Sequence, residues 1–277
     1  MANPIAATSG HVIRDLFGRD KVVIGVVHCP ALPGSPGHGG GPIEDIYDRA
    51  LGDAEAYVVG GVHGLIIENH GDIPFLKPAD IGPETAAHMA VITDRVRRAC
   101  GVPLGLNVLA NGAIPALAIA RAGGAGFVRV NQWANAYVAN EGIIEGEAAK
   151  ALRYRSAIRA GEVKIFADTH VKHGAHAIVA DRSITELTRD VAFFHADAVI
   201  ATGQRTGDTA TMEEIDTVRS ATDLPVLVGS GVTKDNVAAI LARIDGVIVA
   251  SSLKHDGVWW NKVDIHRVKV FMRAIQQ

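Results

Sequence analysis

Short apolar runs alternate with longer amphipathic stretches from about residue 22 to the end of the chain. Each run places β-branched and other apolar residues in succession, without the polar alternation of a half-exposed strand. Continuous runs of this kind are typical of parallel strands that are buried on both faces. The runs cover residues 22–27, 64–69, 103–108, 126–131, 163–168, 197–202, 225–230 and 245–250.

The stretches between these runs have helical spacing. In residues 43–58 the apolar side chains recur every three or four positions, which builds one apolar stripe. Pro83 suits a first helical position, and the glycine pairs within 59–61 and 122–124 suit helix ends. The spacing also predicts two capping boxes, Ser183 with Glu186 and Thr211 with Glu214.

Eight strand–helix units predict a (β/α)₈ TIM barrel that forms one domain over residues 22–277. Residues 1–21 would be an N-terminal extension, with a helix that closes the bottom of the barrel. The alternative is a doubly wound open sheet, which a Gly-rich dinucleotide fingerprint after the first strand would favour. The stretch "GSPGHGG" (34–40) lacks that spacing and is interrupted by proline.

Composition narrows the function classes. The chain has 277 residues, 48% of them hydrophobic, and a net charge of −3, so neither nucleic acid nor an anionic membrane is an expected partner. No apolar run reaches the length of a membrane span. Cys29 and Cys100 form no motif, which favours a reducing, cytoplasmic compartment. Barrels of this class are often homo-oligomers, and we expect the same here.

Polar residues stand at the end of almost every run. Barrel enzymes react at the C-terminal ends of their strands, so these residues are expected to surround one site. The alternative is that they are merely the points where each strand meets solvent. They are His28, Glu68, Asn69, Asn107, Arg129, Asn131, Asp168, Thr202, Ser230, Ser251 and Ser252.

The last two strands carry the most specific signal. "VGSGVTKDN" places a Gly-Ser-Gly turn before a helix expected near Thr233, and two serines follow the eighth run. Barrel enzymes often bind phosphate there through backbone N–H groups, although the turn alone is also an ordinary connection. Arg205 is a further candidate for pairing with phosphate. The predicted contacts to a phosphorylated substrate are Asn131, Thr202, Gly203, Gly229, Ser230, Gly231, Ser251 and Ser252.

Residues 168–176, "DTHVKHGAH", are rich in groups that gain and lose protons. We expect Asp168 or Glu68 to act as acid and base, while Lys172, Arg129 and Asn107 stabilise a developing oxyanion. Lys172 is alternatively a Schiff-base amine. No cofactor is assigned; a divalent metal is the alternative, held where His28, Glu68 and Asp168 converge or by the histidines at 170, 173 and 176.

Three loops around the expected site are unusual. Residues 28–40 hold three prolines and four glycines, and residues 69–84 hold three more prolines, so both loops are expected to form a stiff rim that fixes His28. Residues 132–146 form a long loop whose Trp133 and Tyr137 either cover a ligand or pack against neighbouring loops.

Six stretches of the chain have distinctive wording: "IGVVHCPALPGSP", "IIENHGDIPF", "ALAIARAGGAGFVRVN", "EGIIEGEAAKALRYR", "ADTHVKH" and "VLVGSGV". Together they resemble the BtpA/SgcQ family over about residues 20–270. The resemblance implies a barrel of the ribulose-phosphate-binding type, but it brings no established reaction. At the third strand, Ala110 and Gly112 stand where the family tends to have a basic and an acidic residue.

Three functions follow from these observations. The first is an enzyme that performs aldol-type cleavage, isomerisation or epimerisation on a small phosphorylated sugar or related metabolite. The second, which the family name implies, is a non-catalytic assembly or stability factor for a membrane complex such as photosystem I. The third is a binding protein that senses a phosphorylated metabolite.

Overall fold

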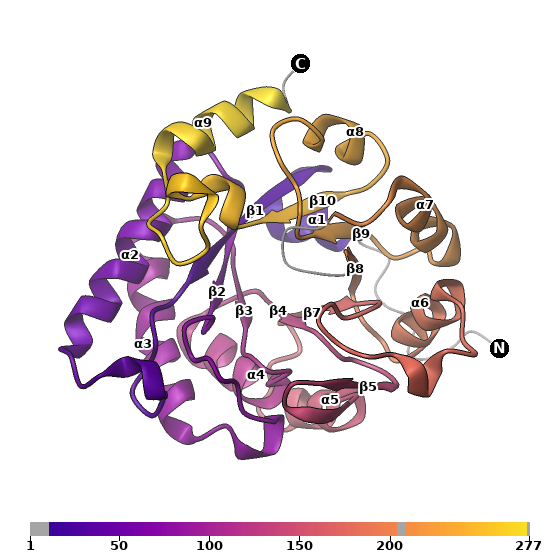
Figure 1. Ribbon diagram of the computed structural model, residues 1–277, viewed down its shortest axis with the longest axis horizontal. Helices are drawn as coiled ribbons and strands as arrows, with labels where there is room; N and C mark the ends of the chain where they lie inside the picture. The colour runs from indigo at the N-terminus through magenta and orange to yellow at the C-terminus, as the bar shows by residue number, and fades with distance from the viewer. Residues whose placement is uncertain (1–10, 204–208, 276–277) are drawn as a thin grey trace.

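The computed structural model describes residues 11–203 and 209–275 of the chain. Within them, eight parallel strands close into a barrel in the order β1-β10-β9-β8-β7-β4-β3-β2 (Figure 1). Each strand falls on one of the apolar runs, so the predicted TIM barrel is confirmed and the open sheet is excluded. The strands are β1 (Val22–His28), β2 (Gly64–Glu68), β3 (Leu104–Asn107), β4 (Phe127–Val130), β7 (Lys164–Asp168), β8 (Ala198–Thr202), β9 (Val226–Gly229) and β10 (Gly246–Val249).

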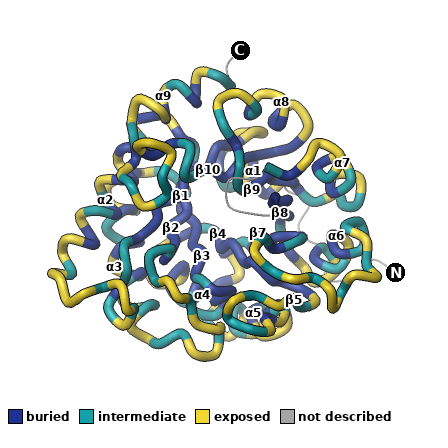
Figure 2. The backbone as a smooth tube through the Cα atoms, in the orientation of Figure 1, coloured by how far each residue is buried: buried dark blue, intermediate teal, exposed yellow. Residues whose placement is uncertain are grey.

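Helices surround the strands, with their exposed faces outward (Figure 2). Across the two described ranges, no helix has the length and apolar character needed to cross a membrane. The helices are α1 (Val12–Phe17), α2 (Ile43–Gly60), α3 (Pro83–Cys100), α4 (Ala113–Gly123), α5 (Ala148–Ala157), α6 (Ile184–Phe193), α7 (Met212–Ala221), α8 (Val237–Leu241) and α9 (Ile265–Ala274). Short 3₁₀ helices are η1 (Pro36–His38), η2 (Pro78–Asp80), η3 (Ala177–Val179), η4 (Ser251–Leu253) and η5 (His255–Gly257).

Local sequence signals set several of the helix ends. The hydroxyls of Ser183 and Thr211 accept the N–H groups of Glu186 and Glu214, so the hydroxyl contact of each predicted capping box is confirmed. Gly61 and Gly124 end α2 and α4 in the left-handed conformation.

The helix expected near Thr233 begins later, at Val237. The Thr233 N–H donates to the Asn236 side chain at 2.8 Å, and this contact holds residues 233–236 as a turn.

Large apolar side chains fill the barrel interior. The Phe127 and Phe166 rings stack at 4.6 Å between centroids, and Phe17 of α1 packs edge-on against Phe127 at 5.7 Å. Ile13 of α1 is fully buried in the same cluster. Gly105 leaves room for Phe127, because a Cβ there would lie 2.3 Å from the ring. The helix α1 therefore closes the N-terminal end of the barrel, and the opposite end stays available for a site.

Residues 132–146, which the sequence predicts as a long loop, contain regular secondary structure. They contain an antiparallel hairpin of β5 (Ala136–Ala139) and β6 (Gly142–Glu145), which a Val138–Ala175 bridge joins to the loop after β7. Trp133 is 1% exposed, and its indole N–H donates to the Phe194 carbonyl at 2.9 Å. Trp133 therefore packs against a neighbouring loop, whereas Tyr137 lines the cavity described next.

Candidate functional site

A cavity of about 590 Å³ lies at the C-terminal ends of the strands. Its volume falls within the usual range of small-molecule sites. Five of the predicted strand-end and substrate-contact residues do not line it, namely Asn69, Asp168, Thr202, Gly203 and Gly229. The predicted residues that do line it are His28, Glu68, Asn107, Arg129, Asn131, Lys172, Ser230, Gly231, Ser251 and Ser252.

Arg129 of β4 and Asp168 of β7 form a buried ion pair. Arg129 donates through Nε and Nη2 to the two Asp168 oxygens, each at 3.0 Å, and Asn131 donates to the same carboxylate at 3.1 Å. Burial alone would lower the pKa of Arg129, but Asp168 outweighs it and the pKa is raised. Asp168 therefore holds Arg129 and Asn131 in place, and Gly229 leaves space beside the guanidinium.

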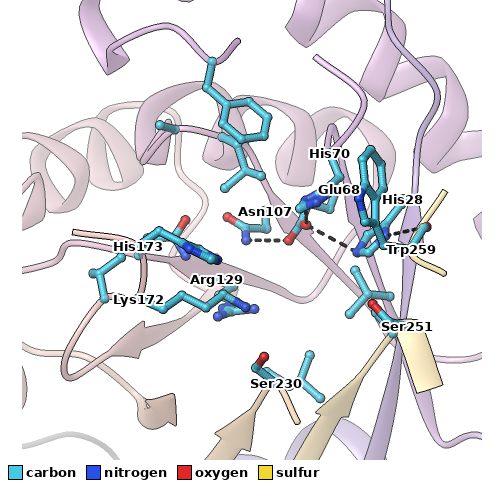
Figure 3. Close-up of a pocket in the computed structure, with 18 of the residues that line it drawn as sticks. His28, Glu68, His70, Asn107, Arg129, Lys172, His173, Ser230, Ser251 and Trp259 are labelled. Carbon is cyan, nitrogen blue, oxygen red and sulfur yellow. Dashed lines mark hydrogen bonds and ion pairs between the residues drawn. The ribbon is translucent and has the colours of Figure 1, made fainter. Parts of the chain in front are cut away.

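The opposite wall of the cavity carries His28, Glu68 and His70 (Figure 3). Glu68 Oε1 lies 2.9 Å from His70 Nδ1 and 3.6 Å from His28 Nε2. The two imidazole rings stack at 4.4 Å between centroids. Asn107 donates to the other carboxylate oxygen at 2.7 Å, and His28 Nδ1 lies 3.2 Å from the Trp259 carbonyl. Ligand atoms of the three residues all lie within 4.8 Å of one another, so this group has the spacing of a metal site.

Burial and neighbouring charges shift the pKa values of His28 and Glu68 in opposite directions. Burial lowers the pKa of His28 to about 3, which outweighs the attraction of Glu68 for the imidazolium. Burial alone would raise the pKa of Glu68, but the hydrogen bond and charge of His70, together with His28 and Arg129, lower it. Glu68 is therefore a carboxylate, and His28 is a neutral imidazole near pH 7.

Lys172 faces the cavity from the loop after β7. Burial, and then the neighbouring charge of Arg129, lower its pKa. In Figure 3 Lys172 and Arg129 lie together, across the cavity from Glu68 and His70. One wall of the cavity is thus cationic, and the other presents a carboxylate and two imidazoles.

Hydrogen bonds join the loops after β9 and β10. The Ser252 hydroxyl donates to the Val232 carbonyl at 2.8 Å. The Gly231 carbonyl accepts from Asn236 at 3.1 Å and from the Thr209 hydroxyl. The Gly231 carbonyl and the Val232 N–H belong to one peptide unit and point in opposite directions. The Val232 N–H therefore points away from Thr209 and Asn236. Backbone at residues 231–232 and 251–252 is therefore held firmly beside the cavity.

Other predicted residues have structural roles or lie elsewhere. The Thr202 hydroxyl donates to the His170 carbonyl at 2.6 Å, and Gly203 is buried next to it. His170 stacks on His176 at 3.8 Å between centroids, so these two rings pair with each other and not with the Glu68 group. Arg205 lies outside the described residues.

Two residues of the site, His70 and Trp259, are not among those predicted from the sequence. His70 follows Glu68 by two positions, and that spacing, which puts side chains on one face of an extended segment, could have revealed it. Trp259 reaches His28 from a loop 231 residues later, which no local signal indicates. The expected convergence of His28 and Glu68 occurs, but His70 takes the place of Asp168 as the third member.

The loops that carry His28 and His70 brace each other. The Leu32 N–H donates to the Asp72 carboxylate at 2.7 Å, and the Gly71 N–H donates to the Cys29 carbonyl at 3.0 Å. Asn69 in turn accepts the Leu109 N–H at 2.7 Å, which ties the loop after β2 to the loop after β3. The Pro- and Gly-rich stretch after β1 therefore lies against a hydrogen-bonded partner loop.

Solved structures share this fold at low sequence identity. A thiamine phosphate pyrophosphorylase from Pyrococcus furiosus superposes with a TM-score of 0.56 and 12% identity, over 96% of this chain and 98% of the other. An N-(5'-phosphoribosyl)anthranilate isomerase from Pyrococcus furiosus gives 0.56 and 13%, over 92% of this chain and 98% of the other. At these identities the likeness establishes the TIM-barrel fold.

Sequence comparison gives a closer relationship. An uncharacterized protein of Archaeoglobus fulgidus is 44% identical over 92% of this chain and 98% of its own length. The photosystem I biogenesis protein BtpA of Synechocystis is 38% identical over 94% of this chain and 90% of its own length. The model of the BtpA family matches residues 19–277. The chain therefore belongs to the BtpA family.

Proposed function

We propose that this protein is an enzyme that acts on a phosphorylated sugar or a related small metabolite. The reaction would be carbonyl chemistry, namely an aldol-type cleavage, an isomerisation or an epimerisation. The phosphate would bind at the loops after β9 and β10, and the reacting carbons would lie between Lys172 and Glu68.

The observation that carries this proposal is the division of the cavity into two chemically different walls. Arg129 and Lys172 offer positive charge on one side, and Figure 3 shows Ser230, from the loop after β9, on the same side as Arg129. Glu68 and His70 offer groups that bind an oxygen or a cation on the other side. A substrate with a phosphate at one end and a carbonyl or hydroxyl group at the other would satisfy both walls.

Lys172 is the group we assign to proton transfer. Its lowered pKa increases the fraction of neutral amine that is able to accept a proton at neutral pH. Both oxygens of Asp168 are occupied by Arg129 and Asn131, so Asp168 acts as a positioning residue. Glu68 is held by His70 and Asn107 and would orient the oxygen of the substrate.

Names of similar proteins support the class of substrate. The two solved structures carry thiamine phosphate and a phosphoribosyl group in their names. The assembly-factor hypothesis is supported by the name of the Synechocystis relative alone. Buried charged groups that come from several strands and line one cavity are expected in an enzyme, whereas an assembly factor does not need them.

A thermal-shift screen tests the proposal. Pentose and hexose phosphates are compared with the free sugars and with inorganic phosphate, because a ligand that binds only the folded chain raises its melting temperature. A phosphorylated sugar that raises it, where the free sugar does not, identifies the compound to assay for turnover. A flat panel at millimolar concentrations contradicts the proposal.

Matched variants locate the phosphate. Ser252→Asp adds a negative charge to the loop after β10 and is expected to abolish the phosphate-dependent shift. Ser220→Asp adds the same charge at an exposed position on α7 and is expected to leave the shift intact. If both variants keep the shift, the phosphate does not bind at this loop.

A further inference from the structure

We propose that His28, Glu68 and His70 bind a divalent transition-metal ion, for which Zn²⁺ is the best match. The three side chains come from the end of β1, the end of β2 and the loop that follows β2. Among the described residues, they form the group of His, Cys, Asp and Glu side chains whose ligand atoms lie close enough to share an ion.

The orientation of His28 provides the first argument. Its Nδ1 lies 3.2 Å from the Trp259 carbonyl, which only accepts hydrogen bonds, so Nδ1 carries the proton. Nε2 then presents a lone pair toward Glu68 Oε1, 3.6 Å away. Nε2 of His28 and Oε1 of Glu68 thus direct lone pairs toward the same space, an arrangement that a cation bound by both atoms stabilises. A metal ion supplies that cation.

The surrounding contacts provide the second argument. Ligands of metal ions are usually oriented by hydrogen bonds from outer groups. Asn107 holds the Glu68 oxygen that faces away from the histidines, at 2.7 Å, and the Trp259 carbonyl holds His28. Both His28 and Glu68 are less than 10% exposed, so little rotamer freedom is left to lose when an ion binds.

The donor atoms select the class of ion. Two imidazole nitrogens with one carboxylate suit Zn²⁺ and related transition ions, whereas Mg²⁺ and Ca²⁺ prefer sites built from oxygen. Three protein ligands also leave a coordination position open, as in catalytic zinc sites. All three side chains line the cavity, so an open position is accessible to a ligand there.

The ion would complement the cationic wall of the cavity. Bound opposite Arg129 and Lys172, it would polarise a carbonyl or hydroxyl oxygen of the substrate. This role rests on the proposed function, but binding of the ion does not. The two are distinguished because ion binding is measured without any phosphorylated compound.

Equilibrium dialysis of the chelator-treated protein against Zn²⁺, followed by elemental analysis, tests the site. One ion per chain is expected, and an equal concentration of Mg²⁺ should not displace it. Asn107→Ala should weaken binding about 10- to 100-fold, because it removes an outer contact of Glu68. A protein that retains no zinc overturns the proposal.

Matched histidine variants locate the ion. His70→Asn is expected to weaken zinc binding more than the outer-contact variant, by at least about 100-fold. His173→Asn changes another histidine of the same cavity and should leave the affinity unchanged. If His70→Asn and His173→Asn bind zinc with the same affinity, the ion is not held by His28, Glu68 and His70. Circular dichroism checks folding, and should His70→Asn not fold, Glu68→Gln decides by the same criterion.

Cobalt gives a second readout. Co²⁺ in place of zinc should produce visible absorption bands that change in Glu68→Gln and stay unchanged in Ser252→Asp. If Ser252→Asp loses the phosphate-dependent shift but keeps these bands, both proposals stand. If the native chain binds the ion and no phosphorylated sugar, the proposed function fails and the metal site remains.

Discussion

Arg129 and Asp168 are joined by two hydrogen bonds of 3.0 Å inside the mouth of the barrel. The pair links β4 to β7, which are neighbouring barrel strands although the β5–β6 hairpin and α5 separate them along the chain. Both side chains are less than 10% exposed. The sequence predicts Asp168 as an acid–base group, and in the structure both of its oxygens accept hydrogen bonds from Arg129 at the wall of the cavity.

This pair predicts a large loss of stability for Asp168→Asn. The substitution leaves the buried guanidinium without its counter-charge, which is expected to cost about 3–5 kcal/mol of unfolding free energy. Urea unfolding measures the loss. Asp216→Asn breaks an exposed pair with Arg243 and should cost less than about 1 kcal/mol. Equal losses in the two variants would contradict the structural role of Asp168.

Lys172→Arg separates binding from proton transfer. Arginine keeps the positive charge but does not release its proton, so it should still support phosphate binding. Once the thermal-shift screen has identified a substrate, kcat is expected to fall at least about 100-fold, while KM changes by only a few fold. Lys150→Arg, at an exposed position on α5, is the control. Unchanged kcat in Lys172→Arg removes this lysine from the proton-transfer step.

Gly71→Ala tests the contact between the two loops of the rim. A Cβ at this position would lie 2.4 Å from the Ala31 nitrogen and 2.7 Å from the Cys29 carbonyl oxygen. Because these are backbone atoms, the loops must separate, at a cost of about 1–3 kcal/mol. Gly41→Ala is the matched control, since a Cβ there meets nothing within 4 Å. Similar melting temperatures for both variants would show that the two loops separate at little cost in stability.

The sequence predicted the barrel well because its strands are buried on both faces. Runs such as residues 22–27 and 245–250 have no other simple explanation, and all eight became strands. Hydroxyl caps at Ser183 and Thr211 were equally local signals. Each of these features depends on residues that are neighbours in the chain.

The site was harder to predict because its contacts join distant parts of the chain. Arg129 and Asp168 both stand near strand ends, and the sequence does not indicate that Arg129 lines the cavity while Asp168, which holds Arg129, does not. The hairpin in residues 136–145 pairs two strands of only four residues each, which give a weak signal in the sequence. Trp259 meets His28 only because the closed barrel brings the loop after β10 beside β1.

His63 gives the protein a stability that depends on pH. Its Nδ1 accepts the Val23 N–H at 3.0 Å, which requires an unprotonated ring nitrogen. Burial, and then the charge of Arg19, lower the pKa of His63 from 6.5 to about 4. Between these two values the unfolded chain takes up a proton that the folded chain does not. The contribution of His63 to stability is therefore complete above pH 6.5 and declines as the pH falls toward 4.

Urea unfolding between pH 7 and pH 4 checks this for the native chain and for His63→Gln. The native chain should be the more stable at pH 7, and its advantage should shrink steadily toward pH 4, because only the native chain loses this hydrogen-bonded neutral imidazole on protonation. His266→Gln, at an exposed position on α9, controls for the loss of a histidine. A difference between native and His63→Gln that stays constant with pH would mean that His63 does not titrate on unfolding in this range.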